Sequence, residues 1–145
     1  MWVAEWIFWG SLIFIFYAYA GYLLILLALS VFRNRPVVAG NIQPMVSFII
    51  TAYNEEPRIK EKIENSLRQQ YPRDCLEIVV ASDCSADRTD EIVRSYESSG
   101  VRLIRAAERR GKEAAQKLAV GQTSGDILVF SDVATTLSPD GIANI

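Results

Sequence analysis

The chain has 145 residues, half of them hydrophobic, and its formal net charge is −2 at pH 7. This composition excludes a disordered charged tail, a collagen-like repeat and a small disulfide-rich secreted protein, and the slight negative charge argues against nucleic acid as a partner. Because the sequence contains no histidine, histidine general bases, Ser-His-Asp triads and histidine-ligated zinc are excluded as well.

The first predicted element is a long apolar helix at the N-terminus. No charged residue occurs from Trp6 to Phe32, and about 20 apolar residues are enough for a helix to cross the hydrocarbon core of a membrane. The tryptophans of the chain gather at the start of this segment, as in an aromatic belt: Trp2, Trp6 and Trp9. We therefore interpret residues 1–35 as a single-pass transmembrane anchor. Arg33 and Arg35 follow the apolar run, so the positive-inside rule predicts an N-terminus outside and a following domain in the cytoplasm.

Two other interpretations of this segment are a cleaved signal peptide and a buried core helix. A signal peptide carries its positive charge before a shorter apolar run, whereas here the arginines come after a longer one. A helix that is apolar on every face over this length is less expected in the core of a chain of 145 residues than across a membrane. Residues 36–44, which contain prolines and a glycine, are then predicted to form a linker.

Beyond the linker, in residues 45–145, strands and helices are predicted to alternate. Short apolar runs bounded by turn residues predict strands at 45–52, 76–81, 101–104 and 127–130. Proline, capping and glycine signals predict helices from Pro57 to about Gln70, after Asp87 or Thr89, at 112–120, and again from Pro139. This order predicts an α/β fold: a parallel sheet with helices on both faces.

Polar side chains follow each predicted strand. In a parallel sheet these positions meet at the carboxyl-terminal edge, where ligands bind. These side chains suit a nucleotide: an aromatic ring can stack a base, an aspartate can accept a base N–H or a ribose hydroxyl, and cations can bind phosphates. A carboxylate beside phosphates also suits magnesium. The sequence has no GxGxxG and no Walker lysine loop, which argues against a dinucleotide-binding Rossmann domain or a P-loop.

At these positions the chain resembles family 2 glycosyltransferases, the inverting group with the GT-A fold that uses nucleotide sugars. The similar motifs occur in the family's order: Val46–Glu56 (VSFIITAYNEE), Gln69–Pro72 (QQYP), Glu77–Thr89 (EIVVASDCSADRT), Gly111–Lys112, and Phe130–Thr135 (FSDVAT). The resemblance covers essentially all of residues 46–145. It implies a GT-A, Rossmann-like parallel sheet preceded by one transmembrane helix.

The resemblance also implies a nucleotide-binding site. Its residues would be Ala52, Tyr53, Glu55, Asp83, Arg110, Lys112 and Asp132. The first three would line the base pocket, Asp83 would hydrogen-bond the base or ribose, and Arg110 or Lys112 would lie near the nucleotide. Asp132 would be the first acid of the family's DxD motif and the ligand of a divalent cation, Mg²⁺ or Mn²⁺.

Simpler structural roles remain open for several of these positions. Glu55 also suits the N-terminus of the following helix through the helix dipole, and Tyr53 also suits half-buried packing. Asp87 is better explained as a helix cap than as a ligand, and Arg109 as a solvated surface charge.

Three features depart from the family pattern. Ala134 stands in place of the second acid of DxD, which removes one metal ligand. Cys84 and Arg88 stand where the family often has glycine, and this matters only if those backbones need a positive φ. The family's acceptor half, with its general base, would lie beyond Ile145, so no catalytic residue is assigned within this chain.

The predicted function is that of a membrane-anchored glycosyltransferase that moves a sugar, with inversion, from a nucleotide-sugar donor to a glycan or lipid-linked acceptor. This chain would hold the donor-binding part. One alternative is a non-catalytic nucleotide-binding or assembly module that docks on partner membrane subunits of a polysaccharide synthase. The other is an inactive truncated fragment.

Overall fold

The computed structural model describes residues 2–32, 40 and 42–145. The chain divides into two compact units, Met1–Asn41 and Ile42–Ile145. Arg33 and Arg35, on which the predicted orientation rests, and most of the linker expected at 36–44 lie outside the described residues.

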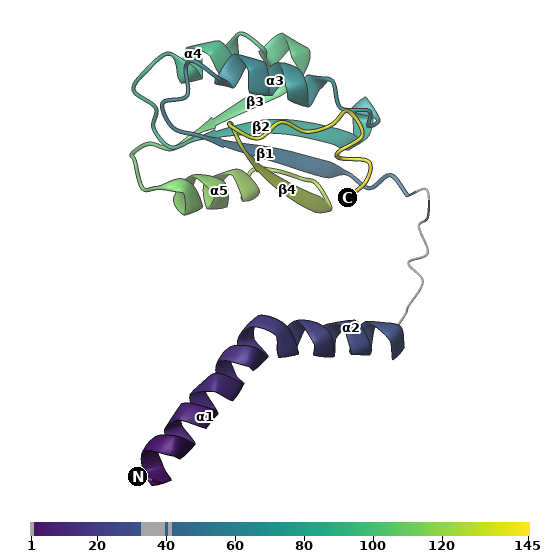
Figure 1. Ribbon diagram of the computed structural model, residues 1–145. Helices are drawn as coiled ribbons and strands as arrows, with labels where there is room; N and C mark the ends of the chain where they lie inside the picture. Colours follow the sequence, from purple (N-terminus) through teal and green to yellow (C-terminus); the bar gives the residue numbers. More distant parts are fainter. Residues whose placement is uncertain (1, 33–39, 41) are drawn as a thin grey trace. The chain divides into compact units, whose positions relative to one another are not determined.

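The described part of the N-terminal unit, residues 2–32, is one continuous helix that bends between its two α-helical stretches (Figure 1). It consists of α1 (Trp2–Phe16), a π-helical turn, η1 (Tyr17–Gly21), and α2 (Tyr22–Phe32). Large apolar side chains are exposed from residue 2 to residue 31 and lie on every face of the helix. Over Trp2–Val31, 30 residues, it is long and apolar enough to cross a membrane, and it is the one such helix among the described residues. The π-helical turn in the middle was not expected from the sequence.

In the second unit, four parallel strands of the described chain form a sheet in the order β3-β2-β1-β4. The strands are β1 (Val46–Ala52), β2 (Leu76–Ser82), β3 (Val101–Arg105) and β4 (Ile127–Asp132). The helices are α3 (Ile59–Leu67), α4 (Thr89–Arg94) and α5 (Lys112–Val120), with short 3₁₀ turns η2 (Arg73–Cys75) and η3 (Glu97–Ser99). Helices α3 and α4 cover one face and α5 covers the other (Figure 1). The predicted α/β fold is confirmed.

The alternation of side chains along β1 builds both halves of the core. Phe48 and Ile50 pack on the side of α3 and α4, where Ile63 closes the cluster. Ile49, between them, points to the other face and packs against Ala115 of α5. Side chains at consecutive strand positions face opposite sides of a sheet, so the unbroken apolar run at residues 48–50 suits a sheet that is covered on both faces.

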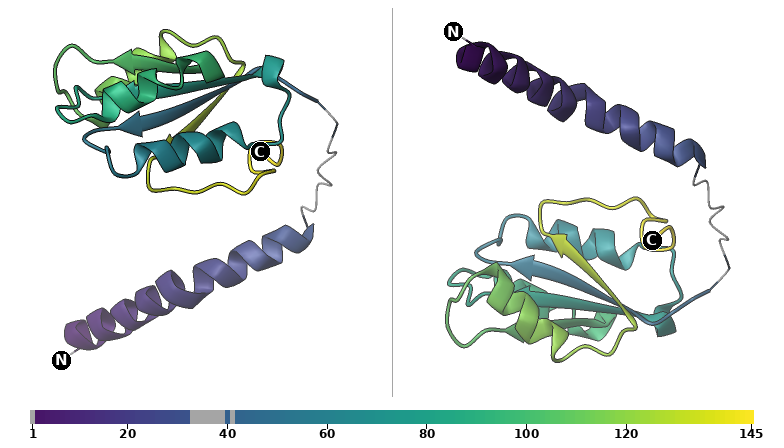
Figure 2. Two further views of the ribbon diagram at one scale, coloured as in Figure 1. Left: turned by 90° about the horizontal axis from the view of Figure 1, so that it is seen from above. Right: turned by 90° about the horizontal axis from the view of Figure 1, so that it is seen from below.

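The helix predicted to begin at Pro139 does not form, and residues 139–144 are turns. The reason lies in α3, which the C-terminal segment follows (Figure 2). The side-chain amide of Asn65 donates to the carbonyl of Leu137 at 2.9 Å and accepts its N–H at 3.0 Å. Gln69 in the same way donates to the Ser138 carbonyl and accepts the N–H of Ile142. The N–H of Ile142, which an α-helix starting at Pro139 would pair with the Ser138 carbonyl, thus bonds to Gln69 just after α3, and the segment keeps only turn hydrogen bonds such as that from Gly141 to Ser138.

Candidate functional site

The strand register brings the predicted site residues to one edge of the sheet. Thr51 of β1 lies opposite Ala81 of β2 and opposite Asp132 of β4. The loops that follow β1 and β2 therefore begin level with the end of β4, at the carboxyl-terminal edge where parallel sheets bind ligands. Tyr53 and Asp83, the first residues after β1 and β2, thus lie at the same edge as Asp132.

Asp83 is 4% exposed, and its carboxylate is bonded to the loop that precedes α5. Oδ1 accepts the backbone N–H of Arg110 at 2.9 Å, and the N–H of Gly111 lies 3.1 Å from Oδ1 and 3.0 Å from Oδ2. Gly111 has φ +92°, a conformation that favours glycine. The acid after β2 thus holds the start of α5 at the edge of the sheet.

Tyr53 is covered by a side chain of the same loop. The guanidinium carbon of Arg109 lies 4.0 Å from the centroid of the Tyr53 ring, in the geometry of a cation–π contact. Arg109 is exposed, as expected for a surface charge, but the stacking on Tyr53 was not anticipated. Arg110 points its guanidinium to Glu108, at 3.6 Å, so in this structure its backbone and not its side chain contacts the site.

Asp132 is paired with Lys112, the first residue of α5. The Lys112 Nζ atom lies 2.6 Å from Oδ1 of Asp132, and both side chains are more than half exposed. Both residues line a cavity of about 280 Å³ at the β4 edge, together with Gln116 and Ser131. The four residues Arg109 to Lys112, which we name the 109–112 segment, thereby contact Tyr53, Asp83 and Asp132.

Ala52 and Glu55 occupy structural positions on the loop after β1. Ala52 is 2% exposed, packs in the core on the α3 side, and its carbonyl accepts the N–H of Asp83 at 3.0 Å. The N–H of Glu55 donates to Oγ1 of Thr89 at 2.8 Å, and its carbonyl accepts the N–H of Ile59 at the start of α3. The Glu55 carboxylate lies 3.9 Å from Arg58. This placement agrees with the simpler role of Glu55 at the N-terminus of α3.

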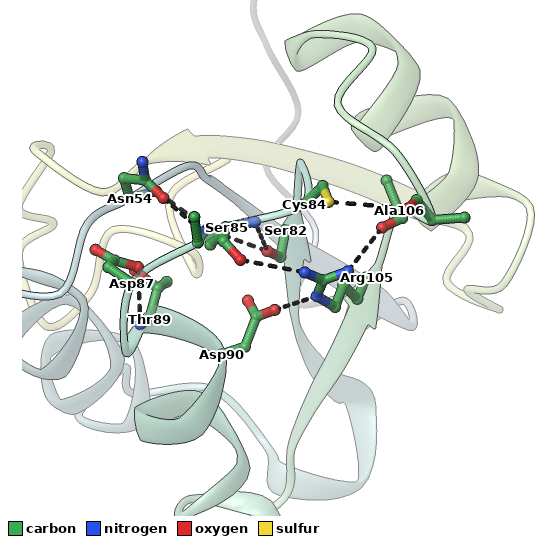
Figure 3. A network of polar contacts seen from close by, with 11 residues as sticks. Asn54, Ser82, Cys84, Ser85, Asp87, Thr89, Asp90, Arg105 and Ala106 are labelled. Carbon is green, nitrogen blue, oxygen red and sulfur yellow. Dashed lines mark hydrogen bonds and ion pairs between the residues drawn. The ribbon is translucent and has the colours of Figure 1, made fainter.

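The loop after β2 is held to the loop after β1 by a polar network (Figure 3). The side chain of Asn54 accepts the N–H of Ala86 at 2.8 Å, and Ser85 Oγ accepts the N–H of Asn54 at 3.2 Å. On the other side, Arg105 donates to the Ser85 carbonyl at 3.2 Å and to Oδ2 of Asp90 at 2.5 Å. The hydrogen bond that Arg105 donates to Asp90 raises the pKa of Arg105. The network fixes the backbone on both sides of Asp83.

Asp87 acts near the start of α4, although Arg88 and not Asp87 occupies the N-cap position. Its Oδ1 accepts the N–H and the hydroxyl of Thr89, at 3.0 and 2.6 Å, and its Oδ2 accepts the N–H of Glu56 at 3.0 Å. Partial burial raises the pKa of Asp87, but the hydrogen bonds from Thr89 and Glu56 together outweigh it and hold the pKa below its ordinary value. Asp87 thus accepts the first backbone N–H of α4, as a helix cap does, but from the residue before the N-cap position.

Cys84 and Arg88, the two positions at which glycine is common in the family, differ in backbone conformation. Cys84 has φ +58°, in the left-handed region, whereas Arg88 has φ −81°. Only the substitution at Cys84 therefore strains the backbone.

Lys62 is a site residue that the sequence analysis missed. It lies on the inward stripe of α3 beside Ile59 and Ile63, is 2% exposed, and its Nζ atom donates to Ser131 Oγ at 2.7 Å and to the Thr135 carbonyl at 2.6 Å. Burial lowers the pKa of Lys62, and the charge of Asp132 opposes this shift. The sequence did contain a signal for this residue: Lys62 lies three positions after Ile59 and directly before Ile63, and thus on the apolar stripe of the helix.

The donor atoms at Asp132 suit a metal only in part. Ala134 has no side-chain oxygen, and among residues 2–32, 40 and 42–145 no group of three or more His, Cys, Asp or Glu side chains is placed to hold a metal ion. Magnesium is commonly bound by one or two carboxylates together with substrate phosphates. Asp132 therefore fits as the protein ligand of a cation that a diphosphate also holds.

Comparison with known proteins gives a family match and solved relatives. The model of the family described as Glycosyl transferase family 2 matches residues 47–145. The succinoglycan biosynthesis protein ExoO of Rhizobium meliloti is 35% identical over 97 residues, which cover 67% of this chain and 27% of ExoO. The probable glycosyltransferase YdaM of Bacillus subtilis is 31% identical over 111 residues, which cover 72% of this chain and 26% of YdaM. The chain thus spans about a quarter of the length of these relatives.

Two solved structures are similar in fold. The mannosyltransferase PcManGT from Pyrobaculum calidifontis, in complex with GDP-Man and Mn²⁺, superposes with a TM-score of 0.73 at 33% identity, over 84% of this chain and 38% of that one. S. aureus TarS 1-349 in complex with UDP-GlcNAc gives a TM-score of 0.64 at 26% identity, over 68% of this chain and 29% of that one.

Proposed function

Because this chain belongs to glycosyl transferase family 2, we propose that residues 45–145 bind the nucleotide-sugar donor of a glycosyltransferase that transfers the sugar, with inversion, to a glycan or lipid-linked acceptor. One observation carries the proposal: the 109–112 segment joins Tyr53, Asp83 and Asp132 at one edge of the sheet. The GDP-Man bound to PcManGT and the UDP-GlcNAc bound to TarS support a nucleotide sugar as the ligand.

Each residue has a role in this proposal. The Tyr53 ring stacks the base. Asp83 holds the 109–112 segment and has lone pairs left over from its two N–H partners, which accept a base N–H or a ribose hydroxyl. The ammonium group of Lys112 and the guanidinium of Arg110 attract the diphosphate, and Asp132 lies beside the ribose and the diphosphate.

These residues act on the leaving-group side of the transfer. The acceptor hydroxyl attacks the anomeric carbon while the bond to the nucleoside diphosphate breaks. A divalent cation, Mg²⁺ or Mn²⁺, held by Asp132 and the diphosphate would neutralise the charge of that leaving group. The described residues of this chain bind and orient the donor, and we assign the general base to none of them.

The N-terminal unit extends the proposal to the membrane. Residues 1–35 would anchor the protein, residues 36–44 would link the anchor to the domain, and Arg33 and Arg35 would keep the domain in the cytoplasm. Protease treatment of right-side-out and inverted vesicles tests the orientation. Cleavage of the domain only in inverted vesicles supports it, and cleavage in right-side-out vesicles contradicts it.

Donor binding is tested by calorimetry on the full chain in detergent micelles, titrated with UDP and with GDP, with and without Mg²⁺. Wild-type protein should bind at least one nucleotide saturably, and Asp132→Asn should weaken the binding. The matched control is Asp126→Asn, the same change just before the other end of β4, which should leave binding intact. No binding of either nucleotide by wild-type protein with a cooperative unfolding transition would exclude the proposed donor site.

A further inference from the structure

The side chain that neutralises Asp132 in this structure is Lys112. Its ammonium group lies 2.6 Å from Oδ1, within the distance of a charge-assisted hydrogen bond. It therefore occupies a coordination position of the carboxylate expected to hold a divalent cation. The cation and the ammonium group cannot share that oxygen without strong repulsion.

The surroundings of Asp132 add positive charge but no further acid. Lys62, on the opposite face of β4, donates to the neighbouring Ser131. Ala134 has replaced the residue that would bring a second carboxylate. Among the described residues that line the cavity, Asp132 is the one acid and Lys112 the one base. In that cavity, a divalent cation without a nucleotide would thus meet one carboxylate that is already paired with an ammonium group.

The ion pair between Lys112 and Asp132 is weak enough for Lys112 to exchange its partner. Both side chains are more than half exposed, and an exposed ion pair contributes little free energy. The backbone of Lys112 is anchored through the preceding Gly111, whose N–H is bonded to Asp83. The flexible four-carbon stem of Lys112 can therefore turn to a new partner while α5 stays in place.

From this geometry we propose that Lys112 and the divalent cation exchange places on Asp132, so that the cation binds only together with the nucleotide. In the free protein Lys112 holds Asp132. When the diphosphate enters, the ammonium group of Lys112 turns to the phosphate oxygens, and the carboxylate of Asp132 becomes available to the cation. The inference rests on the proposed function and adds an order of binding to it.

The test measures Mn²⁺ binding by electron paramagnetic resonance, in which free Mn²⁺ gives the signal, with the full chain in detergent micelles. For wild-type protein, Mn²⁺ alone should bind poorly, and a saturating amount of GDP or UDP should strengthen Mn²⁺ binding. The Lys112→Gln variant should bind Mn²⁺ alone about threefold more tightly than wild type, because an exposed ion pair no longer competes. The same variant should bind GDP and UDP more weakly.

These opposite changes separate exchange from damage to the fold, which would weaken both ligands. Lys117→Gln, on the same helix and exposed, is the matched control and should change neither affinity. Ala134→Asp is an independent variant, which should raise the affinity for Mn²⁺ alone by supplying a second carboxylate.

Two outcomes overturn the exchange: Lys112→Gln binds Mn²⁺ alone no more tightly than wild type, or wild-type protein binds Mn²⁺ equally well with and without a nucleotide that it is shown to bind. A wild-type protein that binds neither GDP nor UDP would instead overturn the proposed function. The Mn²⁺-only comparison of Lys112→Gln with wild type needs no nucleotide, so the two failures are distinguishable.

Discussion

Gly111 donates its backbone N–H to both carboxylate oxygens of Asp83, at 3.1 and 3.0 Å. This contact joins the loop after β2 to the first turn of α5. The next residue, Lys112, reaches Asp132 at the end of β4. The two acids expected to bind the donor are thus connected through two consecutive residues, Gly111 and Lys112.

Replacement of Asp83 should therefore destabilise the domain as well as weaken nucleotide binding. Asp83→Ala leaves the N–H groups of Arg110 and Gly111 without their acceptor, at a cost of about 2 kcal/mol in the free energy of unfolding. Asp83→Asn should cost less, because its side-chain oxygen still accepts. Urea unfolding of the full chain in detergent measures both. Asp74→Ala, at an exposed acid, is the control and should stay within about 0.5 kcal/mol of wild type. An Asp83→Ala variant as stable as wild type would contradict the anchoring role.

Cys84→Gly should stabilise the protein. Cys84 has φ +58°, and a left-handed conformation costs a residue with a side chain about 1–2 kcal/mol, more than the extra chain entropy that glycine loses on folding. The expected gain in the free energy of unfolding is about 0.5 kcal/mol or more. Cys75→Gly is the matched control. Cys75 ends a 3₁₀ turn and does not have a positive φ, so its replacement by glycine should destabilise the folded protein. Thermal unfolding of both variants checks the signs, and a loss of stability in Cys84→Gly would refute the strain.

Lys62 should make stability rise with pH in the alkaline range. Burial lowers the pKa of Lys62, and the charge of Asp132 opposes this shift. The folded chain therefore loses the Lys62 proton at a lower pH than the unfolded chain, in which lysine has a pKa of about 10.4. Between these two values the unfolded state binds more protons, and the free energy of unfolding therefore increases with pH. Wild-type protein should gain stability relative to Lys62→Met as the pH is raised from 7 toward 10.

Urea unfolding at several pH values gives this difference, because titration of the other groups is common to both proteins. Lys60→Met, at an exposed lysine of the same helix, should follow the wild-type profile. Parallel profiles of wild type and Lys62→Met would show that the proton of Lys62 is not released early.

The tryptophans report on the N-terminal helix alone, since all three lie at positions 2, 6 and 9. If the helix spans a bilayer, their rings should lie at the interface. After reconstitution of the full chain in vesicles, lipids brominated near the headgroup should quench the fluorescence more than lipids brominated near the chain ends. A variant with the three tryptophans replaced by phenylalanine and with Ile15→Trp should show the reverse order. Absence of quenching by either lipid would contradict the membrane anchor.

The sequence by itself determined the elements and their order. Apolar runs bounded by turn residues predicted all four strands, and the alternation with helices predicted the parallel sheet. The helix at Lys112–Val120 was predicted with the bounds that the structure has. These features depend on local periodicity and on proline and glycine signals, which neighbouring residues carry. The order of the motifs was likewise sufficient to identify the glycosyltransferase family.

Only the tertiary structure decided what each side chain contacts. The turns after Pro139 follow from Asn65 and Gln69, some seventy positions earlier in the chain, whose amides take up the backbone groups that a helix would have paired. The burial of Lys62 against Ser131 depends on how α3 lies over β4.

The same holds at the candidate site. Which acid the 109–112 segment contacts cannot be predicted until the register of the sheet aligns the ends of β1, β2 and β4. The positive φ at Cys84 is likewise imposed by the fold of the loop after β2 and not by the cysteine itself. Contacts between segments distant in the chain depend on which strands pair and on how the helices pack over them, which the local periodicity of one segment does not specify.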